Sequence, residues 1–162
     1  MTIVADTSPL HYAVLIGAGD AIFHLYGHIV IPTAVYRELL NAGAPESLRQ
    51  WVEGNRHRIE IRQVNLTDDP HLRKLDAGEA EAIQLAQLTP DSLLLIDERD
   101  GRAEAKRRGL NITGLLGVIR DAALSGHIDF EETPGELKRT DFRLSSGVET
   151  LVRALYKSGS PS

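Results

Sequence analysis

The sequence predicts an α/β fold of three layers, α/β/α, around a central, mainly parallel sheet. Short apolar segments alternate with helix-forming segments from residue 2 to residue 125, which is the pattern of successive βαβ units. The segment SLLLI at 92–96 is apolar without interruption, as expected of a strand that helices cover on both faces. Right-handed crossovers would then bring the carboxyl ends of the strands to one edge, where such folds bind ligands.

The first half of the chain opens with a buried strand. Residues 2–5 (TIVA) are apolar and β-branched and end at Asp6. Pro9 suits the first turn of a helix that Gly17 ends. The other elements predicted up to residue 71 are a helix at 20–26, a strand at 28–31, a helix from Pro32 to Leu40, a helix at 46–54, a strand at 57–64 and a polar connection at 65–71.

The second half continues the alternation. The elements predicted there are a helix at 79–88, a strand at 92–96, a basic helix at 99–108, a short strand at 110–113 and a helix at 115–125. Residues 129–141 are polar and predict a loop, and the capping box from Ser146 to Glu149 begins a helix at about 146–157. No domain boundary is evident. We therefore expect one domain over residues 1–162, with a core at about 1–128 and a C-terminal extension.

The composition is that of an ordinary globular domain and excludes several classes. The chain contains no cysteine, which rules out a disulfide framework and thiolate metal sites. No apolar run reaches the length of about 20 residues that a membrane span needs, and the N-terminus does not resemble a signal peptide. We expect a cytoplasmic protein. The net charge of −5 argues weakly against broad, nonspecific binding of nucleic acid, although an acidic metal site would itself contribute negative charge.

Four acidic residues recur where such a fold would gather them at one edge: Asp6, Glu38, Glu79 and Asp97. Asp6 and Asp97 directly follow predicted strands, so they should meet in space. Buried carboxylates without cationic partners are costly unless they bind a cation. Oxygen ligands favour a hard divalent metal, Mg²⁺ or Mn²⁺, which is the chemistry of metal-assisted phosphodiester cleavage.

The same residues resemble the PIN-domain nucleases, in particular the toxin-like branch of VapC-type ribonucleases. The resemblance covers residues 3–125 and rests on IVADTS, IPTAVYREL, GEAEAIQLA and LLLIDERDGR in this order. It implies a metal-dependent endoribonuclease in which Asp6, Glu38, Glu79 and Asp97 are catalytic and hold one or two Mg²⁺ or Mn²⁺ ions. Many of these nucleases have Asp at the third acidic position, where this chain has Glu79.

Several neighbouring residues are candidates for supporting roles. Asp100 is a possible additional metal ligand, and Ser8 is placed to hydrogen-bond a ligand carboxylate or the phosphate. Arg99, Arg102 and Lys106 form a basic stripe with helical spacing that would contact RNA phosphates, or else a solvated face paired with nearby glutamates. Glu81 should lie in solvent, because it faces away from Glu79. Asp6 alone would also suit a helix N-cap.

The resemblance further implies partners. Toxins of this type are held inactive by a small antitoxin protein and are commonly homodimers, for which the apolar stripes at 11–16 and 148–155 are possible interfaces. The alternative function is a PIN-like module that binds nucleic acid or protein without cutting it. A phosphatase or receiver with Asp6 as nucleophile ranks lower, because Asp6-Thr7-Ser8 lacks the second acid of the Asp-x-Asp pattern.

Overall fold

A parallel sheet of five strands forms the centre of the protein, seen here in a computed structural model that describes residues 1–126. All four neighbouring strand pairs are parallel, in the order β3-β2-β1-β4-β5. The strands are β1 (Thr2–Ala5), β2 (Ile29–Pro32), β3 (Ile59–Arg62), β4 (Ser92–Leu95) and β5 (Ile112–Thr113). The fold class predicted from the sequence is confirmed.

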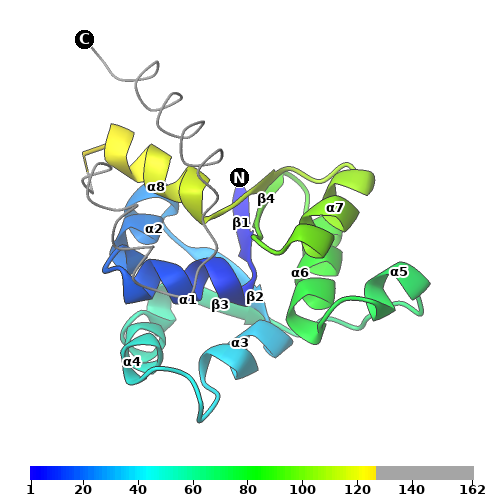
Figure 1. The fold of residues 1–162 in the computed structure, drawn as a ribbon, viewed down its shortest axis with the longest axis horizontal. Helices are drawn as coiled ribbons and strands as arrows, with labels where there is room; N and C mark the ends of the chain where they lie inside the picture. Colours follow the sequence, from blue (N-terminus) through cyan, green and yellow to red (C-terminus); the bar gives the residue numbers. More distant parts are fainter. Residues whose placement is uncertain (127–162) are drawn as a thin grey trace.

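Helices cover both faces of this sheet (Figure 1). One face carries α1 (Thr7–Leu15), α2 (Gly19–Tyr26), α4 (Glu46–Gly54) and α8 (Leu115–Leu124), and the other carries α6 (Ala77–Leu88) and α7 (Arg99–Arg107). The remaining helices are α3 (Thr33–Leu39), α5 (Pro70–Arg73) and the short 3₁₀ turn η1 (Arg56–Arg58). None of the helices in residues 1–126 is long and apolar enough to span a membrane.

The strands divide their side chains between two hydrophobic clusters. Ile3 and Ala5 of β1 pack into the cluster under α1, α2 and α8, whereas Val4 packs into the cluster under α6. This alternation follows from the two-residue period of a strand. Because both faces are covered, apolar residues occur at consecutive positions of the central strands, as the sequence of β4 indicated.

Two local predictions were wrong. The segment 65–71, expected to be a plain connection, contains the start of α5, whose N-cap Asp69 accepts a hydrogen bond from His71 N–H at 2.9 Å and precedes Pro70. The strand expected at 57–64 is shorter, because residues 56–58 form η1 and only Ile59–Arg62 pair with β2. The loop expected at 129–141, the helix expected at 146–157 and the apolar stripe at 148–155 lie outside the described residues.

The parallel strands place their carboxyl ends together, next to the first turns of the helices that follow. The backbone N–H of Asp6 donates to the Leu95 carbonyl at 2.9 Å, so β1 and β4 end side by side. Asp6 is the N-cap residue of α1, and Pro32 at the end of β2 is the N-cap residue of α3. The site at this edge is therefore built from the ends of the central strands and the helices that leave them.

Candidate active site

A cavity of about 180 Å³ opens at this edge and is dominated by carboxylates. Segments far apart in the sequence contribute to it: the start of α1, the end of α3, the start of α6 and the residue before α7. The lining comprises Asp6, Thr7, Ser8, His11, Tyr12, Glu38, Asp76, Glu79 and Glu98. The structure thus brings together three of the four acids that the sequence singled out, with Ser8 beside them.

Asp6 lies deepest in this group, with 3% of its surface exposed. Burial, together with the negative charges of Asp76, Glu79 and Glu38, raises the pKa of its carboxyl to about 8 against the opposing hydrogen bond from Thr7 N–H. Its side chain makes no capping hydrogen bond to α1. Helix capping therefore does not account for the burial of the Asp6 side chain, which is surrounded by other acids.

Glu38 reaches the cavity from α3, with its carboxylate against the first turn of α6. Its carboxylate accepts a hydrogen bond from the Thr7 hydroxyl. Burial raises its pKa, while the hydrogen bonds from Thr7 and from Gly78 N–H act in the opposite direction. A β-carbon at position 78 would stand 2.8 Å from one Glu38 oxygen. Only glycine leaves room for this carboxylate at the first turn of α6.

Glu79 and Asp76 form one acidic unit at the start of α6. Asp76 is the N-cap residue, and its side chain accepts a hydrogen bond from the Glu79 backbone N–H at 2.8 Å. Burial raises the pKa of Glu79 to about 7, and the charges of Asp76 and Glu98 add to this effect. Sequence reasoning missed Asp76, although Asp three residues before Glu in a helical segment is the spacing of a capping box.

Glu81 has a structural contact where solvent was expected. Its carboxylate accepts a hydrogen bond from the Ala34 backbone N–H at 3.2 Å. Ala34 lies in the first turn of α3, where backbone N–H groups have no partner within the helix. Glu81 therefore joins α6 to the helix that carries Glu38, while Glu79, two residues earlier, faces the cavity.

Asp97 stands at the end of β4 as predicted, but it does not line the cavity. Its Oδ1 accepts a hydrogen bond from the Leu115 backbone N–H, at the start of α8, at 3.0 Å. Burial raises its pKa to about 6, against the effects of that hydrogen bond and of the nearby Arg102. Its Oδ2 is buried and has no hydrogen-bond partner among residues 1–126. One oxygen is thus engaged by α8, and the part of the chain that the structure describes supplies no partner for the other.

Asp100 is turned away from the acidic cavity. It lies with Ala103, Glu104 and Arg107 along one face of α7, at the spacing i, i+3, i+4, i+7, and this face borders a second cavity together with α5. The prediction that Asp100 is an additional metal ligand is not supported by this placement. Asp100 therefore borders the second cavity, whereas Glu98, the residue before the helix, lines the acidic cavity.

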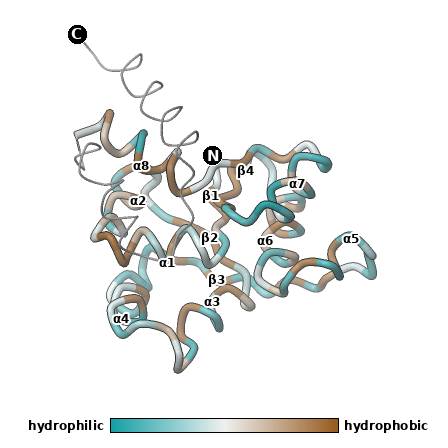
Figure 2. The backbone as a smooth tube through the Cα atoms, viewed as in Figure 1, coloured by the Kyte–Doolittle hydropathy of each residue, from teal (hydrophilic) through white to brown (hydrophobic). Residues whose placement is uncertain are grey.

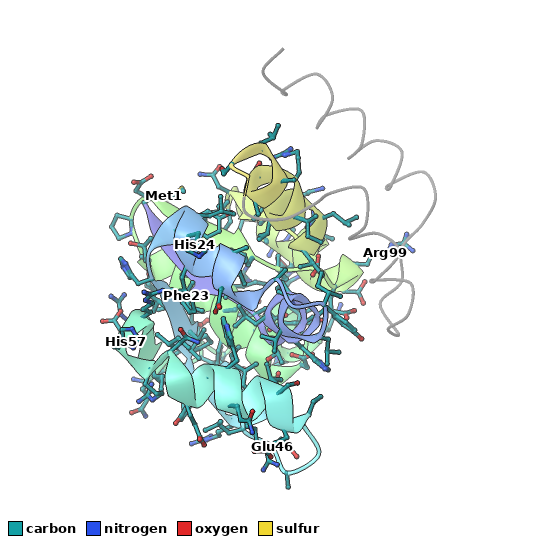
Figure 3. All side chains as sticks on the ribbon, turned by 90° about the vertical axis from the view of Figure 1, so that its left-hand side faces the viewer. Met1, Phe23, His24, Glu46, His57 and Arg99 are labelled. Carbon is teal, nitrogen blue, oxygen red and sulfur yellow. The ribbon has the colours of Figure 1, made fainter. Side chains whose placement is uncertain are left out.

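The basic stripe on α7 divides into two parts. Figure 2 shows that α7 is one of the most hydrophilic helices of the fold. Arg102 is engaged within the protein, since its Nη1 donates to the Ile96 carbonyl at 2.8 Å. Arg99 and Lys106 are exposed, and Figure 3 shows Arg99 pointing away from the body of the domain. The alternative pairing with Glu104 applies to Arg107 and Arg108 instead.

The donor set of the cavity suits a hard cation. Among residues 1–126, five carboxylates line it, and neither lysine nor arginine does. Carboxylate oxygens are the ligands that Mg²⁺ and Mn²⁺ prefer, and a divalent cation would offset the mutual repulsion that raises the pKa of Asp6. Within residues 1–126, no three acidic or histidine side chains already stand in a metal-binding arrangement. The lining residues thus supply the oxygen ligands that such a cation prefers, and their side chains would have to move closer together to coordinate it.

Comparisons with known proteins decide the family. Residues 2–158 match the family model DUF3368, whose description is PIN domain. The chain belongs to the PIN domain family. One similar solved structure is a PilT N-terminus domain protein from the hyperthermophilic archaeon Sulfolobus solfataricus P2. It is 20% identical, and the match covers 75% of this chain and 93% of that one with a TM-score of 0.54. No curated protein matches the sequence. PIN domains are generally nucleases that use divalent metal ions, and the acidic cavity lies in the part of the chain that carries the match.

Proposed function

We propose that this PIN domain is a metal-dependent endoribonuclease that hydrolyses RNA phosphodiester bonds in the acidic cavity. The observation that carries the proposal is the convergence of Asp6 at the end of β1, Glu38 of α3 and Glu79 of α6 on one cavity, to whose lining residues 1–126 contribute no lysine or arginine. A binding module that does not cut has no need for buried acids whose charges oppose one another. This favours the nuclease over the noncatalytic alternative.

Asp6, Glu38 and Glu79 would hold Mg²⁺ or Mn²⁺. Asp97 is the fourth acid of the proposed set, because its buried Oδ2 has no hydrogen-bond partner within residues 1–126. A bound divalent ion supplies a water of lowered pKa and neutralises charge on the phosphate. The protein's own residues do the positioning. The Thr7 hydroxyl orients Glu38, and Asp76 fixes the start of α6 and with it the backbone of Glu79.

Three further side chains have proposed roles toward the RNA. The Ser8 hydroxyl lines the cavity two residues after Asp6, where it can donate to a phosphate oxygen or to an acidic neighbour. Arg99 and Lys106 are exposed basic residues of α7 that we assign to phosphate contacts, whereas the exposed Arg107 is paired with Glu104. We place the protein in the cytoplasm, as a homodimeric toxin paired with a small antitoxin protein. The location rests on the composition of the chain, and the antitoxin and the homodimer rest on the resemblance to VapC-type ribonucleases.

Cleavage assays on purified protein test the function directly. Single-stranded and structured RNAs are incubated with Mg²⁺, Mn²⁺ or EDTA, and the Asp6→Asn and Asp97→Asn variants are run beside the wild type. We expect cutting that depends on the metal and that both variants lose. Cutting that persists in Asp6→Asn, or in EDTA, would refute the proposal. Loss in Asp6→Asn but not in Asp97→Asn would limit the site to the acids that line the cavity.

A further inference from the structure

An aromatic pair borders the acidic cavity, and neither the acids nor the proposed metal accounts for it. The rings of His11 and Tyr12 are stacked, with centroids 4.9 Å apart and an angle of 13° between their planes. Both residues line the same cavity as Asp6 and Glu38, and both are partly exposed. A planar, nearly parallel ring pair beside a candidate phosphodiester site has the shape and chemistry to extend a stack of bases.

The position of the pair follows from the geometry of α1. Ser8, His11 and Tyr12 occupy positions i, i+3 and i+4, which share one face of a helix, and this face borders the cavity. Tyr12 also packs against the hydrophobic cluster beneath α1, so its ring is held by the core. His11 lies on that fixed ring. The pair is thus a prearranged surface rather than two independent side chains.

The charge of the cavity explains why such a surface is needed. The described residues give its lining five carboxylates and no lysine or arginine, so this lining repels an approaching phosphate backbone until a cation is present. Next to the carboxylates, uncharged contacts can add to the binding that the cation and the basic residues of α7 provide. Stacking of a base on an aromatic ring is such a contact, and it tolerates different bases because every base has a π face.

We infer that the ring pair of His11 and Tyr12 beside the carboxylates of Asp6 and Glu38 is a stacking platform for an unpaired nucleobase adjacent to the phosphodiester that is cut. The inference rests on the proposed ribonuclease function and narrows its substrate. A base within a duplex has both faces covered by its neighbours, so the platform selects single strands, loops or bulges over continuous double-stranded RNA.

Kinetics of paired variants test the platform. Once the cleaved phosphate is mapped in a single-stranded RNA, KM is measured for Tyr12→Leu, which keeps apolar packing without a ring, and for His11→Ala. Each should raise KM about tenfold, and Tyr12→Phe and His11→Phe should recover most of that loss. The control is His28→Ala, on the exposed turn before β2, which removes an imidazole far from the cavity lining. Thermal unfolding shows that each variant is folded.

An abasic substrate separates stacking from other roles. RNA with an abasic nucleotide on either side of the mapped phosphate should raise KM for the wild type, and Tyr12→Leu should add little to that rise. If the KM increases caused by the abasic nucleotide and by Tyr12→Leu simply multiply, the inference is overturned. It is also overturned if the variants that lack a ring cleave RNA like the wild type. If His11→Phe is as slow as His11→Ala, with the loss in kcat, then His11 transfers a proton and the platform is refuted.

Failure of the parent proposal gives a different pattern. If the wild type cuts no RNA, binding of fluorescein-labelled single-stranded and duplex RNA is followed by anisotropy with Mn²⁺ present. Preference for the single strand that Tyr12→Leu weakens and Tyr12→Phe restores would support the platform without the nuclease. Absence of binding, or equal binding by all variants, would overturn the platform as well.

Discussion

Gly78 lies directly against the carboxylate of Glu38: a β-carbon at position 78 would stand 2.8 Å and 2.9 Å from its two oxygens. The backbone N–H of the same glycine also hydrogen-bonds this carboxylate. The first turn of α6 thus both accommodates and orients an acid that belongs to α3. The geometry of the acidic cavity depends on the absence of a side chain at this one position.

Gly78→Ala should therefore reduce activity without unfolding the protein. Alanine favours a helix over glycine by about 1 kcal/mol, but its methyl group would push the Glu38 carboxylate out of place, and small misplacements in a site can cost about 100-fold in rate. The measurement is kcat for RNA cleavage, with Mn²⁺ affinity measured in parallel. Gly54→Ala is the matched control, because Gly54 also lies in a helix and nothing stands within 4 Å of an added β-carbon. Equal activity of the two variants would show that Glu38 needs no fixed position.

The stability of the metal-free protein should fall as pH rises. Asp6, with a pKa of about 8, and Glu79, with a pKa of about 7, bind protons more tightly in the folded than in the unfolded chain. Their contribution to the free energy of unfolding is fully present below their unfolded pKa values near 4 and is lost as pH rises to about 8. Thermal unfolding from pH 4 to pH 9 in EDTA measures this. Asp6→Asn should flatten the curve, and Mn²⁺ should raise Tm more at pH 8 than at pH 5. A wild-type curve as flat as that of Asp6→Asn would contradict the pKa of Asp6.

Two glutamates of α6 should separate into a functional and a structural residue. Glu79→Gln removes an acid from the cavity and should abolish cleavage, whereas Glu81→Gln keeps an acceptor for Ala34 N–H and should leave cleavage near wild type. Glu81→Ala leaves that N–H unpaired and should lower the free energy of unfolding by about 1 kcal/mol. Denaturant unfolding and cleavage rates on the same preparations check this. Loss of cleavage in Glu81→Gln with unchanged stability would place Glu81 in the site.

The basic residues of α7 should differ in the same way. Replacing both Arg99 and Lys106 by alanine should weaken RNA binding and reduce the slope of log affinity against log salt by about 1.4, the value for two contacts with a single strand. Arg102→Ala should instead lower the free energy of unfolding by about 1.5 kcal/mol, because it removes the hydrogen bond to the Ile96 carbonyl.

The control for the salt dependence is the double alanine variant of Arg56 and Arg58. These two exposed arginines precede β3, at the opposite edge of the sheet from β5. An equal change of slope in both double variants would mean that RNA contacts are spread over the surface rather than gathered on α7.

The sequence predicted which edge of the sheet carries the site better than it predicted which side chains line the cavity. An acid at the end of a buried strand is visible in the sequence, because strand termini and their edge follow from the parallel topology. Asp6 and Asp97 were placed in this way, and Glu38 and Glu79 by family resemblance. The direction in which a side chain points is not visible in the local sequence. Asp97 follows β4 as expected, yet its Oδ1 accepts a hydrogen bond from Leu115 N–H, 18 positions later.

Other misses have similar causes. Asp100 was tied to the site by its nearness to Asp97, whereas the helical period turns it to the face shared with Glu104. Asp76 was overlooked because a capping residue looks local in sequence, although its charge acts on Asp6, Glu38 and Glu79. Glu81 was expected in solvent because its partner, the N–H of Ala34, belongs to a helix 47 positions away.

The placement of β1 between β2 and β4 has a consequence for the newly made chain. Asp6 is synthesised ahead of the other acids of the site, yet the carbonyl that its N–H meets belongs to Leu95, and the lining is completed only by Glu98. Because synthesis proceeds at about 5–20 residues per second, several seconds pass between the synthesis of Asp6 and that of the residues that complete the cavity around it. A chain that cuts RNA would thus be harmless to its own message and ribosome until β4 has joined the sheet.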